Sequence, residues 1–145
     1  MKILVLNGPN INMLGIREPD VYGKESFADL LALLEQTAKE EAVQITQYQS
    51  NHEGCLVDQI QAAYGVFDGI VINPAAYTHT SVALLDAVKA VGVPTVEIHI
   101  SDPDTREDFR HMSYVREACI ATVKGEGLKG YLHAIDILVD KSKGN

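Results

Sequence analysis

The sequence has no tryptophan, only two cysteines among its 145 residues, and no apolar run near the ~20 residues that a membrane-spanning helix needs. Cys55 and Cys119 stand far apart and outside any CxxC spacing, which argues against a zinc site with thiolate ligands. We expect both to be free and to pack as small apolar side chains, with a disulfide between them as the alternative. Because aromatic residues make up only 6% of the chain, aliphatic side chains must fill the core.

Basic residues are also scarce. The 12 lysines and arginines are outnumbered by 20 acidic residues, which gives a net charge of −8. Binding to phosphates requires a basic face, so this balance argues against a nucleic-acid partner, and no basic amphipathic stretch suggests a membrane surface. The apolar run after Lys2 is too short for a signal peptide. The sequence therefore predicts a cytoplasmic protein that binds neither nucleic acid nor a membrane.

What the chain does contain is a regular alternation of two apolar patterns. Short apolar runs rich in branched residues are typical of buried strands, and apolar residues spaced three and four apart are typical of amphipathic helices. The expected strands are residues 2–7, 43–49, 69–73, 94–100 and 118–125. The expected helices are residues 26–42, 55–64, 81–91 and 130–141, the first with Ser26 as its N-cap.

This order of elements predicts the fold. Strands that alternate with helices form a parallel sheet with helices on both faces. We therefore expect residues 1–145 to form a single α/β domain. Its fold would be a flavodoxin-like, doubly wound, five-stranded parallel sheet with strand order 2-1-3-4-5, in three α/β/α layers.

Polar side chains follow the apolar runs of the central strands. Ligands of open α/β sheets bind outside the carboxyl ends of the strands, so these side chains should converge on one crevice. They are Asn7, Asn10, Asn12, Asn73, His79 and His99.

The four arginines are concentrated near the same crevice. Arg17 lies in the loop after the first strand, and Arg106, Arg110 and Arg116 follow the fourth strand. Scarce guanidinium groups placed at a crevice suggest recognition of a planar anion, most simply a carboxylate. Arg106 is followed at once by two acidic residues, and we expect it to form a solvated ion pair with them.

Glu97 and His99 stand two residues apart on one strand and so face the same side of the sheet. A carboxylate beside an imidazole orients the ring and favours its charged form, although a buried structural pair gives the same pattern. No P-loop, GxGxxG or GxSxG motif is present, and no spacing supports a metal site built from His79, His99 and His111. These observations favour an acid–base enzyme that uses neither metal nor cofactor.

Six segments, taken in order, resemble the signature segments of type II 3-dehydroquinate dehydratases. They are "NGPNINMLGIREPDVYG", "YQSNHEG", "INPAAYTHTS", "VEIHIS", "REDFRHMSY" and the final "GLKGY", and they extend over almost the whole chain. The resemblance implies a flavodoxin-like fold and the reversible dehydration of 3-dehydroquinate to 3-dehydroshikimate, a step of the shikimate and quinate pathways. It also implies that no metal or cofactor is used, and that the assembly is a homododecamer made of four trimers.

The resemblance assigns the catalytic roles to three residues. Tyr22 matches the base, which takes a proton from the carbon next to the ketone, and His99 matches the general acid, which protonates the departing hydroxyl. A free tyrosine has a pKa of about 10, so a phenolate base at neutral pH needs stabilisation. Arg17 matches the arginine with that role. Base and acid lie on different elements, which permits the family's anti elimination through an enolate.

Further positions match residues that bind the substrate or support the catalytic groups. Asn12 matches a residue that places a water against the enolate, an oxyanion-hole role, and Glu97 would hold the ring of His99. The other implied substrate-binding residues are Asn73, His79, Asp86, Ile100, Ser101 and Arg110. Among these, Asp86 would reach the site of a neighbouring subunit, and Ile100 and Ser101 would hold the substrate carboxylate through their backbone.

Two positions depart from the family pattern. Ala75 stands where the family usually has Gly, and it would cost about 1 kcal/mol if the backbone there needs a positive φ. Asp102 and Pro103 replace a pair such as Asn-Ile, and an acid next to the carboxylate site would weaken substrate binding. Neither change touches Tyr22 or His99, so we expect an active enzyme.

The segment over residues 7–23 is long for a loop and is expected to act as a lid over the crevice. Gly15 and Gly23 would be its hinges, and residues 17–24 would be mobile without ligand. Two other functions remain open on the residues alone. One is a flavodoxin-like module that binds a small anion or nucleotide without catalysis, and the other is a metal-dependent hydrolase.

Overall fold

A computed structural model describes residues 1–16 and 18–144. Its strands are β1 (Lys2–Asn7), β2 (Gln44–Gln49), β3 (Gly69–Asn73), β4 (Thr95–His99) and β5 (Ala121–Lys124). Its α-helices are α1 (Pro19–Tyr22), α2 (Phe27–Glu40), α3 (Glu53–Ala62), α4 (Val82–Val91) and α5 (Lys129–Lys143). Short 3₁₀ turns are η1 (Ile11–Met13), η2 (Ala75–His79), η3 (Pro103–Thr105), η4 (Asp108–Arg110) and η5 (Val115–Ala118).

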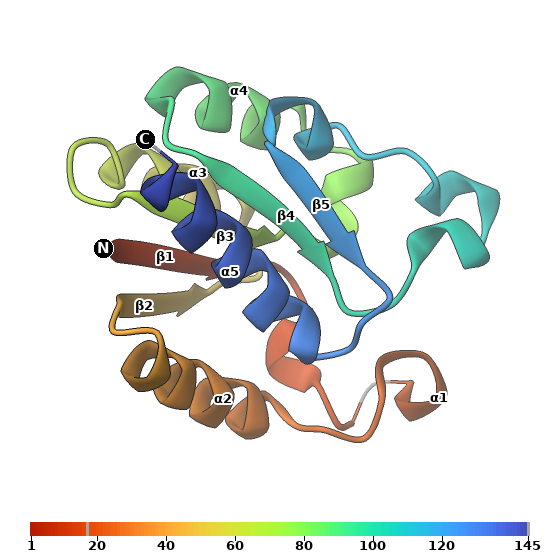
Figure 1. Ribbon diagram of the computed structural model, residues 1–145. Coiled ribbons are helices and arrows are strands. Elements are labelled where there is room, and N and C mark those ends of the chain that lie inside the picture. The colour runs from red at the N-terminus through yellow and green to blue at the C-terminus, as the bar shows by residue number, and fades with distance from the viewer. Residues whose placement is uncertain (17, 145) are drawn as a thin grey trace.

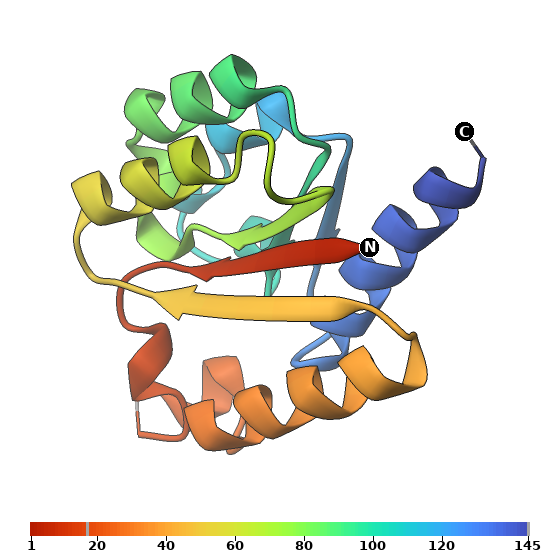
Figure 2. The same ribbon diagram turned by 90° about the vertical axis from the view of Figure 1, so that its left-hand side faces the viewer.

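The five strands form one parallel sheet in the order β2-β1-β3-β4-β5. Helices α2 and α5 cover one face, and α3 and α4 cover the other (Figures 1 and 2). The predicted flavodoxin-like fold and strand order are confirmed. In the described part of the chain, no helix is both long enough and apolar enough to span a bilayer.

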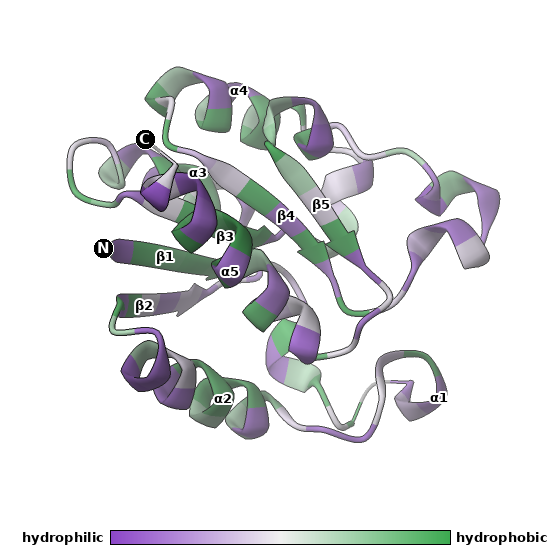
Figure 3. Cartoon of the chain, in the orientation of Figure 1, coloured by the Kyte–Doolittle hydropathy of each residue, from purple (hydrophilic) through white to green (hydrophobic). Residues whose placement is uncertain are grey.

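The central strands are apolar on both sides because each side packs against a pair of helices. In β1, Ile3 and Val5 point toward α2 and α5, whereas Leu4 and Leu6 point toward α3 and α4. All four are fully or almost fully buried. Figure 3 shows the resulting contrast between the hydrophobic strands and the largely hydrophilic outer surfaces of the helices.

Helix α2 begins where its sequence predicts. The Ser26 hydroxyl accepts a hydrogen bond from the Asp29 backbone N–H (3.1 Å), and the Asp29 carboxylate accepts one from the Ser26 N–H (2.8 Å). This reciprocal capping box satisfies two N–H groups that the first turn leaves free. Leu30 and Leu34 then face the sheet and are buried. Cys55 and Cys119 are both free, as expected.

The prediction of a strand over residues 118–125 is wrong at its start. Residues Val115–Ala118 form η5, and β5 begins only at Ala121. The apolar residues of η5 serve packing rather than pairing, since Val115 is fully buried in the cluster beneath α4. The short turns η1, η3 and η4 and the four-residue helix α1 also fall in segments that were expected to be loops. A single turn is too short to show a helical period.

The residue at the first departure from the family pattern adopts a left-handed backbone. Ala75 has a φ of 52°, in a turn where its N–H donates to the Asn73 side chain at 3.1 Å. A residue with a Cβ is strained in this conformation, whereas glycine is not. The backbone at Ala75 therefore does need a positive φ, so alanine at this position is expected to cost stability.

We predict that Ala75→Gly raises the free energy of unfolding by about 1 kcal/mol, because glycine adopts a positive φ without strain. Ala76→Gly is the matched control. Ala76 lies in the same turn and has no positive φ, so glycine there should lower stability by up to about 1 kcal/mol. Urea denaturation of both variants measures the difference. Equal effects at the two positions would contradict the strain at Ala75.

Candidate active site

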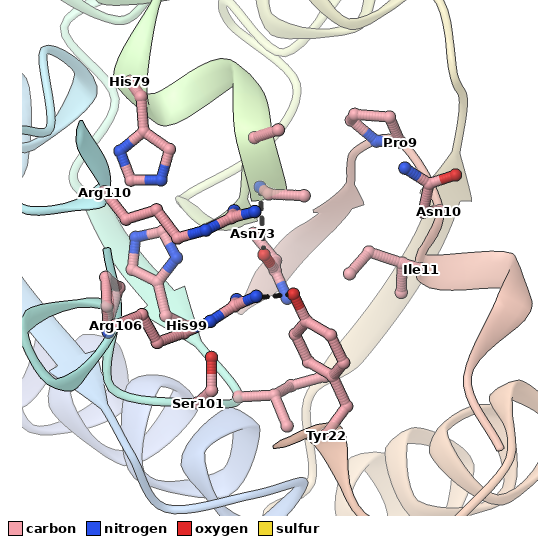
Figure 4. Close-up of a pocket in the computed structure, with 14 residues that line it drawn as sticks. Pro9, Asn10, Ile11, Tyr22, Asn73, His79, His99, Ser101, Arg106 and Arg110 are labelled. Atoms are coloured by element: carbon pink, nitrogen blue, oxygen red, sulfur yellow. Dashed lines mark hydrogen bonds between the residues drawn. The ribbon is translucent and has the colours of Figure 1, made fainter. Parts of the chain in front are cut away.

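A pocket lies at the carboxyl ends of β1, β3 and β4 (Figure 4). Six segments line it: the turn after β1, helix α1, the end of β3, the turn η2, the end of β4, and the segment that carries η3 and η4. The lining residues are Pro9, Asn10, Ile11, Tyr22, Asn73, Ala75, Ala76, His79, His99, Ile100, Ser101, Pro103, Arg106 and Arg110. The predicted crevice is thus present at the predicted edge of the sheet.

Parallel register brings the strand ends together. Asn7 pairs with Asn73, and Ile72 pairs with Glu97, so three neighbouring strands end almost level. Gly8 allows the chain to leave β1 tightly, because a Cβ at that position would lie 2.6 Å from the Pro74 carbonyl oxygen. Any larger residue would push the turn after β1 away from β3.

Asn73 lines the floor of the pocket, and Asn7 and a tyrosine of the last helix support it from beneath. The Tyr131 hydroxyl donates to Asn7 Oδ1 (2.6 Å) and accepts from Asn73 Nδ2 (2.9 Å). Tyr131 is completely buried, and burial raises the pKa of its phenol well above the usual value. Asn7 also donates to Gln47 Oε1 at 3.0 Å. These bonds fix the Asn73 amide, which the sequence assigned to substrate binding, in one orientation.

His99 is held from behind by Glu97. The His99 Nε2 and Glu97 Oε1 atoms are 2.6 Å apart, and their side chains are 7% and 0% exposed. A carboxylate can only accept, so Nε2 carries the proton that it donates. This leaves Nδ1 as the nitrogen of His99 that can serve a ligand in the pocket.

The Glu97 carboxylate accepts from four further donors. Burial on its own raises the pKa of Glu97, but hydrogen bonds from His99 and the hydroxyls of Ser113 and Thr78 outweigh it and hold the pKa well below the usual value. The donors to Oε1 are His99 (2.6 Å), Thr78 (2.7 Å) and Ser113 (2.6 Å), and those to Oε2 are Arg116 Nε (3.0 Å) and Thr122 (3.1 Å). Glu97 is therefore a fully buried, ionised carboxylate.

Tyr22 projects into the pocket from α1 and meets Arg106. Arg106 Nη1 donates to the Tyr22 hydroxyl at 2.6 Å, and its guanidinium carbon lies 5.1 Å from the centre of the ring. The Arg106 side chain is only 14% exposed. Its Nη2 also lies 3.9 Å from the Glu18 carboxylate. The prediction that Arg106 forms a solvated ion pair with the two acidic residues after it is therefore wrong.

His79 faces the same pocket from η2. Its Nδ1 lies 2.6 Å from the Met112 carbonyl oxygen, so Nδ1 carries the proton and Nε2 is left as an acceptor. Burial lowers the pKa of His79, which keeps the ring neutral at neutral pH. Nearby, Arg110 Nε donates to Glu107 at 2.5 Å. That bond uses one of the five N–H groups of Arg110 and leaves others for a ligand.

The structure brings together most of the predicted site residues. Those that line the pocket are Tyr22, Asn73, His79, His99, Ile100, Ser101 and Arg110, with Glu97 in contact behind His99. Two others lie outside the lining. Asn12 is exposed and accepts from Gln49 at 3.3 Å, and Asp86 is exposed on α4. Arg17 lies outside the described residues.

The sequence placed Arg106 near the crevice but gave it no role in the site. Its acidic neighbours suggested solvent, whereas the turns η3 and η4 bring it back over the pocket. Arg116 differs from expectation in another way. It does bind a carboxylate, but that carboxylate belongs to Glu97 of its own chain rather than to a ligand.

The contacts of Asp102 show how its charge is used. The Asp102 carboxylate accepts from the Asp104 N–H at 3.0 Å and lies 3.9 Å from the Lys124 ammonium, which also binds Asp104. Its charge is thus used to cap η3 and is offset in part by a lysine that it shares with Asp104. Pro103 starts that turn and lines the pocket as an apolar side chain. Weaker substrate binding through Asp102 stays a prediction.

A phenol next to a guanidinium, an imidazole on a buried carboxylate and a second arginine form a site for acid–base chemistry on a small anion. A flavodoxin-like sheet with this site at its strand ends defines the class of protein. The comparisons with known proteins give the family. Residues 1–139 match the model of the class II dehydroquinases, and the chain belongs to this family.

Two relatives and one solved structure illustrate the match. The 3-dehydroquinate dehydratase of Corynebacterium glutamicum strain R is 53% identical over 98% of each chain. That of Lachnoclostridium phytofermentans is 51% identical over 99% of this chain and 100% of its own. The crystal structure of the type II dehydroquinase from Butyrivibrio crossotus has a TM-score of 0.94 at 49% identity, covering 96% of this chain and 97% of its own.

We predict that Glu97→Gln destabilises the protein by about 3–5 kcal/mol near neutral pH, because it leaves buried donors without their charged acceptor. The low pKa of Glu97 in the folded state fixes the pH dependence. As pH falls below about 4.5, the unfolded chain takes up a proton that the folded chain does not, so this contribution is lost. The stability difference between wild type and variant should therefore be constant above about pH 5 and shrink below it.

Denaturant titrations at several pH values measure this difference. Glu35→Gln is the control, because Glu35 is exposed and pairs only with Lys39 at 3.8 Å; it should cost less than about 0.5 kcal/mol. A difference for Glu97→Gln that persists undiminished to about pH 3 would mean that Glu97 is not ionised in the folded protein.

Proposed function

We propose that this chain dehydrates 3-dehydroquinate with Tyr22 as base and His99 as acid. As a member of the class II dehydroquinase family, the chain is a lyase that converts 3-dehydroquinate reversibly to 3-dehydroshikimate. The observation that carries the assignment of roles is that the Tyr22 phenol and the His99 imidazole, from different elements, line one pocket. A passive binding module has no use for that pair.

The base needs a phenolate. Tyr22 would take the proton from the carbon next to the substrate ketone, and negative charge would then pass to the ketone oxygen as an enolate. Arg106, bound to the Tyr22 hydroxyl at 2.6 Å, supports this role, since a cation at that distance favours the phenolate. Arg17 would add a second positive charge. Asn12 would hold the water that donates to the enolate oxygen.

The acid acts next. His99, as imidazolium, would give the proton on Nδ1 to the hydroxyl of the substrate as the carbon–oxygen bond breaks. The hydroxyl leaves as water, the enolate electrons form the new double bond, and His99 is left neutral. Glu97 keeps the ring in place through Nε2 during this step. Two groups on different elements can act on opposite faces of the substrate, which supports an anti elimination.

The remaining pocket residues would recognise the substrate. The backbone N–H groups of Ile100 and Ser101, at the end of β4, would hold its carboxylate, and Arg110 would add a charge-assisted hydrogen bond. Asn73 and His79 would bind its hydroxyl groups. Since His79 offers Nε2 as an acceptor, we expect it to accept from a substrate hydroxyl rather than donate to one.

We predict that the EDTA-treated protein forms an enone from 3-dehydroquinate, seen as rising near-ultraviolet absorbance, and that Tyr22→Phe removes nearly all turnover. The phenylalanine ring keeps the shape but cannot accept the proton. Tyr64→Phe is the matched control, because Tyr64 is 71% exposed and outside the pocket; it should turn over like the wild type. Turnover by a folded Tyr22→Phe variant would refute the base, and loss of activity on chelation would refute the cofactor-free route.

We also propose that the chain acts as one domain in a cytoplasmic homododecamer, a tetramer of trimers. Asp86 supports this assembly, because it matches a substrate-binding position of the family yet lies on α4, outside the pocket of its own chain. It would then complete the site of a neighbouring subunit. The reaction would serve the shikimate pathway or quinate breakdown.

We predict that Asp86→Asn and Tyr22→Phe, each poorly active alone, recover activity when they are unfolded together and reassembled. Mixed trimers would contain sites with an intact Tyr22 from one chain and an intact Asp86 from the next. The measurement compares the activity of the refolded mixture with that of each variant refolded alone. Sedimentation confirms that the assembly contains twelve copies. If the mixture is no more active than its parts, Asp86 serves its own chain or none.

Residues 18–24 are compatible with the lid that the sequence predicts. They are exposed or half-buried, and Gly23 has a φ of 87° and a ψ of 175°, a conformation open essentially only to glycine. A wider groove lies beyond the pocket, and both cavities share Tyr22 and Arg106, which stand between them. Opening of the lid would therefore require the Tyr22–Arg106 contact to break. The mobility itself stays a prediction.

A further inference from the structure

The Glu97 carboxylate has two cationic partners on different oxygens. Oε1 accepts from His99 at 2.6 Å, and Oε2 accepts from Arg116 Nε at 3.0 Å. Two positively charged or chargeable groups thus compete for one buried negative charge. The proposed reaction uses His99 and Glu97 but gives no role to Arg116.

Arg116 is fixed firmly enough to act on this site. It lies on η5, where its backbone N–H donates to the Ser113 hydroxyl (3.2 Å), and that hydroxyl in turn donates to Glu97 Oε1 (2.6 Å). Its side chain is one-third exposed, while the carboxylate that it binds is fully buried. A guanidinium keeps its charge at any pH at which the protein is folded, so this partner of Glu97 never titrates.

A permanent cation on Glu97 changes what His99 must do. Without it, a neutral His99 would leave the buried carboxylate with only uncharged donors, namely the Nε2–H of His99 and three hydroxyls, which is costly, and the imidazolium would hold its Nδ1 proton tightly. With it, the carboxylate stays balanced after His99 has given its proton away. The repulsion between the two cations also makes that proton easier to release.

We propose that Arg116 is a positioning residue that acts through Glu97 to set the acid strength of His99. This inference rests on the proposed role of His99 as the general acid. Arg116 touches neither the pocket nor the substrate, and it works by sharing the charge of the carboxylate that holds the ring.

Other charged and titratable groups surround His99 and stay constant in the test. Tyr22, His79, Arg106 and Arg110 face it across the pocket, and Lys124 is its neighbour on β5, where it is bound to Asp104. His99 and Arg116 both bind the Glu97 carboxylate directly, so a change at Arg116 reaches His99 chiefly through that carboxylate.

The main experiment is a ¹⁵N NMR titration of the histidines in the wild type and in Arg116→Gln, with the His99 signal assigned by its loss in His99→Gln. We expect the His99 midpoint to move up by about one pH unit when the guanidinium is removed. Arg116→Lys should restore most of the shift, because lysine keeps the charge. Lys141→Gln removes one charge from the exposed end of α5 and should leave the midpoint unchanged.

Turnover gives a second readout. In Arg116→Gln the basic limb of the kcat/KM profile, which reports the free enzyme as the NMR titration does, should move up by the same amount as the NMR midpoint, while the acidic limb, set by the base, stays in place. The plateau should fall about threefold, as Brønsted behaviour gives for an acid weaker by one pH unit at a coefficient near one half. A merely structural arginine would lower the melting temperature without moving either the limb or the midpoint.

The outcomes separate this inference from the proposed catalytic role. A His99 midpoint that moves by less than about 0.3 pH unit in a folded Arg116→Gln, or that moves down, overturns the inference whatever the activity. Full turnover by His99→Gln overturns the acid role instead. Should Arg116→Gln not fold, Thr122→Val decides, since it removes a neutral donor to the same oxygen at 3.1 Å. A small upward shift then supports the inference that donors to Glu97 Oε2 act on His99 through the carboxylate, and no shift or a downward one overturns it.

Discussion

A single carboxylate organises this protein's active site. Glu97 lies on β4, near the carboxyl ends of the strands, and is completely buried. It accepts hydrogen bonds from η2, β4, the segment before η5, η5 itself and β5. An ionised carboxylate in that position is tolerated only because each of its oxygens has charged or hydroxyl partners. The hydrogen bonds that stabilise this charge also tie five segments of the chain to one point. One of these segments is the end of β4, which carries His99.

The opposite wall of the pocket is formed by turns near the surface rather than by a buried hydrogen-bond network. Tyr22 and Arg106 come from the two segments that leave the sheet after β1 and after β4, and they meet through a hydrogen bond between a guanidinium and a phenol. One side of the site is thus fixed by a buried network, and the other is formed by turns near the surface. This division suits the proposed roles, in which the acid is held still while substrate is admitted beside the base.

The fold was readable from the sequence because the central strands are apolar on both faces and the helices have one apolar side. Runs such as residues 69–73, which are short and rich in branched side chains, are typical of a buried strand, and the pair Ser26–Asp29 marks the start of α2. Motif positions that matched a known family picked out Tyr22 and His99, and the structure places both in one pocket. These matches gave their proposed roles but not their contacts.

What the sequence could not provide depends on turns of three or four residues. Arg106 and Arg116 both follow the fourth strand, yet η3 and η4 turn one over the pocket while η5 turns the other toward Glu97. No periodicity distinguishes these two destinations. Likewise, the tight turn of Ala75 follows from a single backbone angle, which residue type alone only makes costly.

The floor of the pocket also joins distant parts of the chain. Tyr131, on the last helix, ties together Asn7 and Asn73 at the ends of two central strands, across 124 residues in the case of Asn7. During synthesis, the strands, Tyr22 and His99 all emerge from the ribosome before this tyrosine does. An unfinished chain therefore holds both groups proposed to react but lacks the support beneath the pocket, so catalytic competence should arrive only when the C-terminal helix docks.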